Sequence, residues 1–306
     1  MKPSRRSSVP ARFRGLEGVT DQVSRVVDAH IHLWDPANST WYPYLSHPPD
    51  DSEGDPSRMF RPFDVATYRS ESAHWNVEKF VNVAAATGRH SVDESIELDR
   101  TAATNGGPHA IIGGLPPTDT VAEAVHLLDR QMAAPLFRGV RPMGGNREPV
   151  PPQEILHALK DRNLVFELMA RGDELLPAAL QLARIDRGCI VIEHTGWPRS
   201  GSDDEFAMWK LGIQALADLG PEVVCKLSGL AMPLKSTERD KLAPWLEYAI
   251  DIFGVERCMF ASNFPVDATF GSFDDLYETF SDVTAGLDEL SREKLFAATA
   301  ERVYRL

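Results

Sequence analysis

Cysteine is scarce in this chain of 306 residues, which has Cys189, Cys225 and Cys258 and no Cys-x-x-Cys spacing. An odd number of cysteines without that spacing is not typical of a disulfide framework or a zinc knuckle. Each cysteine lies in an apolar segment, so we interpret all three as buried, reduced side chains. A reduced state indicates a cytoplasmic location.

Long apolar runs and an excess of basic residues are also missing. No run approaches the roughly 20 apolar residues that a membrane-spanning helix needs, so we expect no membrane span. The chain has 32 Lys and Arg against 45 Asp and Glu, a formal net charge of −13. This acidic balance argues against a nucleic-acid partner and against binding to an anionic membrane.

The first fifteen residues contain basic but no acidic side chains. No apolar segment follows the Arg5-Arg6 pair, so we reject an export signal. We predict a flexible tail over residues 1–24, with an organelle transit peptide as the alternative.

A simple alternation runs along the chain from Val26 onward, in which a short β-rich apolar run is followed by a polar loop and an amphipathic segment. Several of the apolar runs are continuous, which is typical of strands that are covered on both faces. The predicted strands cover residues 26–32, 79–85, 109–115, 137–142, 164–169, 189–194, 222–228 and 257–262.

Amphipathic segments, some with Pro at their start or Gly at their end, predict helices between and after these strands. They cover residues 119–133, 152–163, 174–188, 204–220, 272–287 and 291–306. Eight strands alternating with helices match a (β/α)8 TIM barrel, so we predict an α/β fold in which residues 25–306 form a single barrel domain. A doubly wound open sheet is the competing fold, but the Gly-rich phosphate turn that it needs after the first strand is missing.

The segment at residues 35–78, between the first two predicted strands, is long and rich in proline and aromatic residues. We predict a lid-like loop here, because active-site lids lie on long loops at the carboxyl ends of barrel strands. Trp41 and Tyr44 in this loop would cover the ring of a bound substrate. Ordinary loop packing is the alternative for both.

Three histidines stand at predicted strand ends. His30 and His32 are two residues apart in the first strand, so both should face the barrel mouth, and His194 ends the sixth strand. Imidazoles aimed at one point can hold a divalent metal ion or polarise a carbonyl group. Buried structural histidines are the alternative.

Charged residues occupy three further strands. Arg141, in the fourth strand, can clamp a carboxylate, and a salt bridge to Glu167 on the next strand is the alternative. Lys226 lies in an otherwise apolar strand, so it needs either an anionic partner or an open barrel mouth. We expect Arg141 and Lys226 to hold carboxylates or hydroxyls of a substrate, and Glu167 to be a further substrate-binding residue.

In their order, several segments of the chain resemble those of the amidohydrolase superfamily, in particular the amidohydrolase-2 group of sugar-lactone and 2-pyrone-4,6-dicarboxylate lactonases. The matching segments are VDAHIHLWDP, WYPYL, FRGVRP, VIEHTGWP, VCKLSGL and RCMFASNFPVD, and they extend from residue 26 to residue 267. The resemblance implies a distorted (β/α)8 barrel with its active site at the carboxyl mouth.

By the same resemblance, His30, His32 and His194 match family histidines that bind a divalent metal ion or polarise the substrate carbonyl directly. We expect one weakly held zinc or manganese ion at these three residues, or a metal-independent mechanism. Arginines of the family bind substrate carboxylates, which is the role that the resemblance implies for Arg141.

One position departs from the family pattern. The family's usual Gly-Ser-Asp-Trp-Pro reads Ala-Ser-Asn-Phe-Pro at residues 261–265, so Asn263 replaces the aspartate that takes a proton from the attacking water. An amide is no base near neutral pH. Three hypotheses follow: Asp267 serves as the base, a histidine does so while Asn263 orients water or binds an oxyanion, or hydrolysis has been lost.

The main hypothesis is a carboxylic-ester hydrolase that opens a lactone or similar cyclic ester of a small polar or carboxylated molecule. His30, His32 and His194 would polarise the carbonyl, and Asp267 or a histidine would accept the proton of the water. The alternatives are a decarboxylase of an aromatic or unsaturated acid, and a non-catalytic ligand-binding barrel. We expect a small-molecule partner, and amphipathic helices on the barrel exterior suit a monomer or a homo-oligomer alike.

Overall fold

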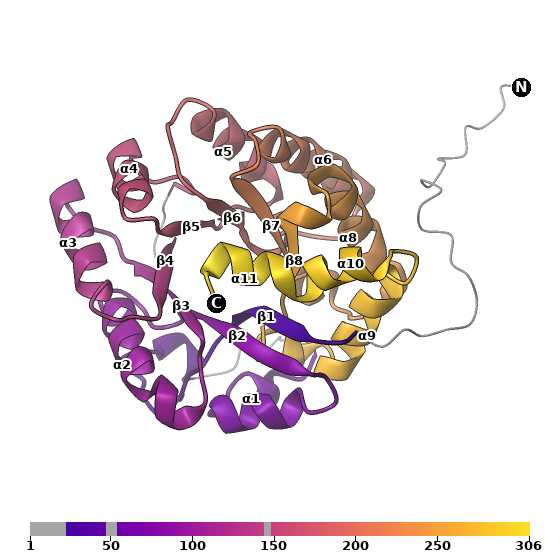
Figure 1. The fold of residues 1–306 in the computed structure, drawn as a ribbon, viewed down its shortest axis with the longest axis horizontal. Helices are drawn as coiled ribbons and strands as arrows, with labels where there is room; N and C mark the ends of the chain where they lie inside the picture. The colour runs from indigo at the N-terminus through magenta and orange to yellow at the C-terminus, as the bar shows by residue number, and fades with distance from the viewer. Residues whose placement is uncertain (1–22, 47–53, 144–147) are drawn as a thin grey trace, which may run out of the picture.

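The computed structural model describes residues 23–46, 54–143 and 148–306 (Figure 1). In this part of the chain, eight parallel strands form one sheet in the order of the sequence. The strands are β1 (Val26–Ile31), β2 (Val77–Val83), β3 (Ala110–Leu115), β4 (Phe137–Pro142), β5 (Val165–Leu168), β6 (Ile190–Ile192), β7 (Val223–Leu227) and β8 (Cys258–Phe260). Every strand lies within two residues of its predicted bounds.

The two ends of the sheet meet just beyond β8. Ile31 and Phe264 form an isolated parallel bridge, and His32 N donates to Phe264 O at 2.8 Å. Asn263 N donates to His30 O at 2.8 Å. The sheet is therefore a nearly closed barrel, and the predicted (β/α)8 fold is confirmed.

Helices surround the strands (Figure 1). They are α1 (Val65–Glu71), α2 (His90–Asn105), α3 (Val121–Gln131), α4 (Gln153–Asp161), α5 (Leu175–Leu182), α6 (Asp203–Ala217), α7 (Ala231–Leu234), α8 (Arg239–Phe253), α9 (Phe273–Val283), α10 (Glu289–Glu293) and α11 (Thr299–Tyr304). The sequence pattern did not indicate α1, α2, α7 or α8. α2 buries Ser91 and Glu94 along with Val92, so it has no apolar stripe, and α8 contains Pro244, which is typical of a helix end.

The segment at residues 35–78 is only partly a loop. It contains α1 and the short 3-10 turns η2 (Pro43–Leu45) and η3 (Pro56–Arg58). Asp64 caps α1 by accepting a hydrogen bond from Thr67 N at 2.8 Å. Tyr68 of α1 is fully buried and donates to Asp28 at 2.9 Å, so α1 is part of the barrel wall. Residues 47–53 of the predicted lid, and residues 1–22 of the predicted tail, lie outside the described residues.

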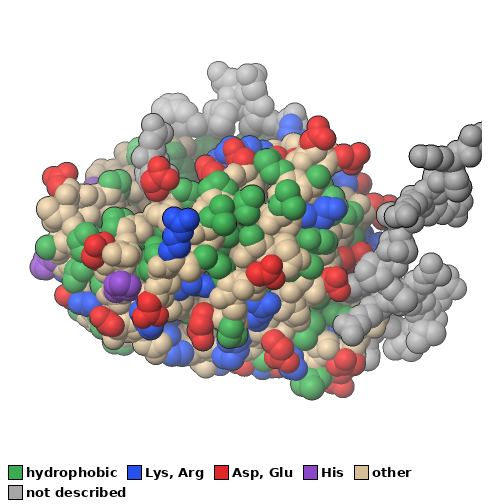
Figure 2. Space-filling view, turned by 90° about the horizontal axis from the view of Figure 1, so that it is seen from above, with side chains coloured by type: hydrophobic (Ala, Val, Ile, Leu, Met, Phe, Trp, Pro, Cys, Tyr) green, Lys and Arg blue, Asp and Glu red, His purple; other side chains and the backbone are tan. Residues whose placement is uncertain are grey.

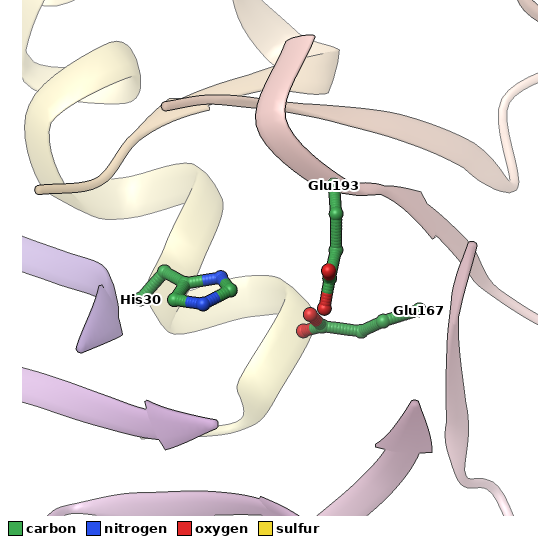
Figure 3. Close-up of side chains that lie close together, drawn as sticks. All are labelled: His30, Glu167 and Glu193. Carbon is green, nitrogen blue, oxygen red and sulfur yellow. The ribbon is translucent and has the colours of Figure 1, made fainter. Parts of the chain in front are cut away.

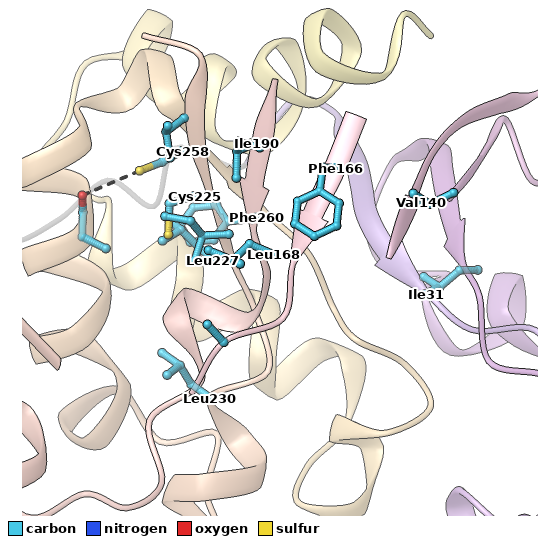
Figure 4. Packing of buried hydrophobic residues seen from close by; sticks show 14 of the residues in the cluster. Ile31, Val140, Phe166, Leu168, Ile190, Cys225, Leu227, Leu230, Cys258 and Phe260 are labelled. Atoms are coloured by element: carbon cyan, nitrogen blue, oxygen red, sulfur yellow. Dashed lines mark hydrogen bonds between the residues drawn. The ribbon is translucent and has the colours of Figure 1, made fainter. Parts of the chain in front are cut away.

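Large apolar side chains fill the layer between strands and helices (Figure 4). Phe166, Ile190, Leu227 and Phe260 are all buried in it. Burying a side chain of this size contributes about 1.5–3 kcal/mol to folding. This layer fixes the strands, and with them the side chains at their carboxyl ends.

The cysteines take part in packing. Cys225 and Cys258 are fully buried, Cys189 is partly buried, and all three are free thiols. Cys258 Sγ donates to Ala249 O at 3.8 Å (Figure 4). Burial raises the pKa of the Cys189 and Cys225 thiols to about 12, so both stay protonated at neutral pH.

A second apolar cluster fills the barrel interior. It joins strand residues such as Val27 and Val165 to Val303 and Tyr304 near the C-terminus. In Figure 1, α11 crosses the ring of strands. Arg138, near the start of β4, donates to Tyr304 O at 2.8 Å. The C-terminal helix therefore closes the amino-terminal end of the barrel, and the site belongs to the opposite end.

Figure 2 shows the face that carries α5 and α6, where apolar, acidic and basic side chains are interspersed. Leu176 and Leu180 of α5 and Leu211 of α6 are exposed. Such apolar residues suit a homo-oligomer, which stays a prediction. Among the helices of the described ranges, none has the length and apolarity that a membrane crossing requires. The cytoplasmic location also stays a prediction.

Candidate active site

A cavity of about 280 Å³ lies at the carboxyl ends of the strands. Active sites of (β/α)8 barrels lie at this face, so this cavity is the candidate active site. The described residues that line it are His32, Trp34, Tyr44, Met59, Ala85, Thr87, Arg141, Met143, Met169, His194, Trp197, Gly229, Met232, Asn263 and Val266. Most of them lie at the end of a strand or directly after it.

β1 changes face just before its two histidines. Val27 and Ile31 would share a face in a regular strand, yet Val27 packs in the interior cluster and Ile31 in the outer layer. The register of β1 against β2 shifts between Asp28 and Ile31. This shift lets His30 and His32 both face inward, where their Nε2 atoms lie 3.2 Å apart. The sequence predicted the shared side of the two histidines but not the shift that produces it.

The hydrogen bonds of His30 and His32 define where their protons lie. His32 Nδ1 lies 2.8 Å from Val83 O, so Nδ1 carries the proton and donates it. Lys226 Nζ lies 3.4 Å from His30 Nδ1, and an ammonium group can only donate. His30 therefore carries its proton on Nε2 and donates to His32 Nε2. Burial is the main cause that lowers the pKa of both rings well below the usual range, followed by Lys226 for His30 and Arg141 for His32.

His194 stands on a segment of left-handed backbone. His194, Thr195 and Trp197 have φ angles of 53°, 55° and 36°, a conformation that costs residues other than glycine roughly 1–2 kcal/mol each. Ser228 Oγ lies 3.1 Å from His194 Nδ1. A Cβ at Gly229 would lie 2.4 Å from His194 Cγ, so glycine is needed for the ring to fit. Backbone strain of this kind concentrates at functional sites.

His194 lies beside His30 and beside a buried carboxylate. Its ring centroid lies 4.7 Å from that of His30, so the fold brings the three predicted histidines together. Its Nε2 lies 3.7 Å from Glu193 Oε2, and Arg141 Nη1 lies 3.5 Å from the same oxygen. Burial, and then the charges of Arg141 and Lys226, lower the pKa of His194 to about 3. The ring is therefore neutral at physiological pH.

Lys226 has the anionic partner that its position predicts. Its Nζ lies 2.8 Å from both carboxylate oxygens of Glu167, and both side chains are fully buried. Tyr304 also donates to Glu167, at 2.6 Å. Burial, opposed by the charge of Lys226, raises the pKa of Glu167 to about 7. The alternative salt bridge from Arg141 to Glu167 is wrong, because Lys226 holds Glu167 and Arg141 lies beside Glu193.

Asn263 and Asp267 form one hydrogen-bonded pair. Asn263 Nδ2 donates to Asp267 Oδ1 at 2.9 Å. Asn263 Oδ1 and Asp267 Oδ2 are buried and have no hydrogen-bond partner among the described residues. Asn263 lines the cavity, and Asp267 lies behind it, fully buried. Burial raises the pKa of Asp267 to about 7, although Asn263 and the backbone amides of Ala231 and Gly229 favour its ionised form.

The two aromatic residues of the predicted lid lie differently. Tyr44 lines the cavity and donates to Ala85 O at 3.0 Å. Trp41 is not one of the described lining residues. Its ring stacks on His90, with ring centroids 6.0 Å apart and planes at 18°. Trp41 therefore packs against the start of α2, which is the alternative that the sequence left open.

One candidate set of metal ligands is His30, Glu167 and Glu193. Each offers one atom, and these atoms lie within 4.8 Å of one another (Figure 3). Lys226 already neutralises Glu167 with two hydrogen bonds of 2.8 Å. The ammonium group therefore supplies the positive charge that a metal ion would bring to this set.

The other candidate set is the predicted one, His30, His32 and His194. The 3.2 Å between the Nε2 atoms of His30 and His32 suits two ligands of one zinc or manganese ion. A ligand nitrogen must be free of its proton, however, and Lys226 favours the form of His30 that is protonated on Nε2. The described residues therefore offer a possible metal site, at which Lys226 opposes tight binding of the ion.

Several parts of the site were not predicted. Glu193 has a weak signal, since it is a carboxylate in an apolar strand next to His194. For Trp34 and Gly229, the sequence contains no signal that distinguishes a site residue from an ordinary packing or turn residue. The four methionines of the cavity come from four separate segments, so only the folded chain brings them together.

The chain is similar to known proteins along nearly its whole described length. The family model described as amidohydrolase matches residues 27–306. The chain is 29 % identical over 300 residues to the uncharacterized protein y4mH of Sinorhizobium fredii. This match covers 92 % of the present chain and 98 % of y4mH. It is 29 % identical over 299 residues to an L-fucono-1,5-lactonase of Burkholderia ambifaria, with 92 % and 95 % covered.

Among solved structures, the fold is similar to that of an amidohydrolase from Burkholderia multivorans with bound zinc. The TM-score is 0.75 at 22 % identity, and the match covers 92 % of this chain and 100 % of that one. At this identity the likeness shows the fold alone.

Proposed function

Because this chain is a hydrolase of the amidohydrolase family, we propose that it opens a lactone or a similar cyclic ester by attack of water. The family match confirms the resemblance carried by the ordered sequence segments. One observation supports the proposal above all: three suitable groups line a single cavity. They are the guanidinium of Arg141, the neutral imidazole of His194 and the side-chain oxygen of Asn263, which has no hydrogen-bond partner among the described residues.

Arg141 and His194 supply the electrophilic side of the reaction in this proposal. His194 Nε2 lies 3.7 Å from the Glu193 carboxylate, which favours the ring proton on Nε2, so we assign Ser228 Oγ as the donor to His194 Nδ1. Arg141 Nε has no hydrogen-bond partner within the described part of the chain. Both groups would donate to the lactone carbonyl oxygen and stabilise the negative charge that develops there. A neutral imidazole suits this role because it keeps its proton as a donor.

Asn263 and Asp267 supply the nucleophilic side. Asp267 lies behind Asn263 and does not line the cavity, so in the proposal the Asn263 side chain shifts to admit a water to Asp267 Oδ2. A water that then donates one hydrogen to Asn263 Oδ1 and the other to Asp267 Oδ2 has a lone pair left for the carbonyl carbon. Asp267 accepts the proton as the new carbon–oxygen bond forms. It returns that proton to the ring oxygen as the ester bond breaks, so the product is the open hydroxy acid. A pKa of about 7 suits this exchange near neutral pH.

His30, His32, Lys226 and Glu167 act as positioning residues in the proposal. Of these, only His32 lines the cavity. The hydrogen bonds from Lys226 through His30 to His32 hold the imidazoles in one arrangement. All steps use side chains of the chain itself, and none passes through a metal ion.

Turnover of a lactone panel by the purified full-length protein tests the proposal. A pH indicator would report acid formation, and release of carbon dioxide from aromatic acids would be followed in parallel. We expect lactone opening that falls by about 100-fold or more in kcat/KM in Arg141→Met, while Arg100→Met, at an exposed position, retains it. Release of carbon dioxide without lactone opening would replace the proposal with a decarboxylase. Binding without any turnover would favour the non-catalytic barrel.

A further inference from the structure

Apolar side chains form most of the cavity wall. Four of the eight methionines of the chain line it, Met59, Met143, Met169 and Met232. The described lining contains no Asp, Glu, Lys or Gln side chain. Methionine is unbranched and polarisable, so it adapts to irregular apolar groups and makes favourable contacts with aromatic rings.

Two indole rings add flat walls to the cavity. Trp34 stacks on His32, with ring centroids 5.5 Å apart and planes at 9°. Trp197 meets His194 edge-on, with ring centroids 5.5 Å apart and planes at 75°. The Arg171 guanidinium lies 4.6 Å from the centroid of the Trp197 ring. Both indoles are therefore held in place as largely apolar parts of the cavity wall.

Most polar groups of the wall are already hydrogen-bonded within the protein. Tyr44 and Thr87 donate their hydroxyls to backbone oxygens at 3.0 and 3.2 Å. His32 uses both ring nitrogens, for Val83 O and for His30. These groups have little left for hydroxyls of a substrate.

The polar atoms that remain are few. In the proposed reaction, the free polar atoms of Arg141, His194 and Asn263 bind the reacting ester and the water. Trp34 Nε1 is then left, a buried donor without a partner among the described residues. A single such donor satisfies one acceptor of a ligand, whereas each hydroxyl of a sugar lactone needs partners of its own when it is buried.

From this inventory we infer that the substrate is a lactone whose ring carries an apolar arm, aromatic or alkyl, and few or no hydroxyl groups. The inference rests on the proposed function, since it assigns the polar atoms of the wall to the reacting ester. The arm lies against the methionines and the two indoles. This separates the chain in substrate class from a lactonase of polyhydroxylated sugar acids.

The test compares two six-membered lactones on the full-length protein, 5-phenyl-δ-valerolactone and D-glucono-1,5-lactone. We expect kcat/KM to be at least tenfold higher for the phenyl compound. Faster opening of the sugar lactone would overturn the inference and leave the proposed function standing. If neither is opened, calorimetry with the corresponding lactams decides: preference for the phenyl lactam supports the ligand class without the activity, and no preference overturns it.

Variants of the methionines make the test specific to the wall. Met232→Gln and Met59→Gln place an amide where a thioether lies, so the ratio of kcat/KM for the phenyl lactone to that for unsubstituted δ-valerolactone should fall at least threefold. Met208→Gln, on the exposed side of α6, is the matched control and should leave the ratio unchanged. An unchanged ratio in both cavity variants would refute the role of the methionines.

Discussion

Asn263 Nδ2 donates a hydrogen bond of 2.9 Å to Asp267 Oδ1. The side-chain oxygen of the same amide, Asn263 Oδ1, has no hydrogen-bond partner among the described residues. The two residues close a tight turn, in which Asp267 N donates to Asn263 O at 3.2 Å. Asn263 has a φ of 57°, a left-handed conformation that asparagine adopts more readily than most residues. The turn thus keeps a carboxylate beside the cavity although the strand-end position carries an amide.

Substitution of Asp267 tests its role as the base. Asp267→Asn preserves shape and removes the proton acceptor, so we expect kcat to fall by about 100-fold or more while KM changes little. Steady-state kinetics on an opened lactone would measure this, with circular dichroism to confirm folding. If the variant keeps more than a tenth of the kcat, Asp267 is not the base, and a histidine takes that role. His194 is then the first histidine to test.

The pH dependence of kcat should follow the same carboxyl. Burial raises the pKa of Asp267 from 3.8 to about 7, so the group is protonated and unable to accept a proton at lower pH. We expect kcat to rise by about tenfold per pH unit below pH 7 and to level off above it. Glu94 and Glu167 also have pKa values raised to about 7 by burial. Loss of the rise in Asp267→Asn would assign it to Asp267, and its persistence there would assign it elsewhere.

Gly229 should be intolerant of alanine because of His194. A Cβ would lie 2.4 Å from His194 Cγ and Nδ1, and φ at this position is 66°. Gly229→Ala should displace the ring and lower kcat/KM by at least about tenfold. Gly106→Ala is the matched control, with a φ of 78° and open space around the added carbon. It should lose about 1 kcal/mol of stability and no activity, and equal kinetic effects in the two variants would contradict the steric argument.

The sequence predicted the barrel because burial on two faces leaves continuous apolar runs, such as Ile190–Ile192 of β6. It also predicted that Lys226 needs an anion. It did not identify Glu167 as that anion, since Arg141 offers a cation of equal charge in the neighbouring strand. The His30 side chain faces the barrel interior because the register of β1 shifts between Asp28 and Ile31, and no residue type in the strand predicts this shift.

The buried pair of Lys226 and Glu167 should matter for stability. Lys226→Met leaves the Glu167 carboxylate buried without its partner, which costs about 3–5 kcal/mol. Lys226→Met combined with Glu167→Gln removes both charges and should regain most of that loss. Urea unfolding would measure the three free energies. Lys160→Met, which breaks a surface pair with Asp186, should change stability by less than about 1 kcal/mol. A comparable loss in Lys226→Met and Lys160→Met would contradict the argument.

Lys226 should also decide how the chain responds to metal ions. Its ammonium group lies 3.4 Å from His30 Nδ1 and favours the form of His30 whose Nε2 is protonated, which opposes a metal ion between His30 and His32. Mass spectrometry of the purified protein after dialysis against a chelator should find well under one zinc or manganese per chain, with lactone turnover retained. Lys226→Met frees His30 Nδ1 for the proton, so zinc bound per chain should rise in that variant. One tightly held ion in the unaltered protein, lost together with activity, would show instead that the histidines keep their Nε2 atoms free for a metal despite Lys226.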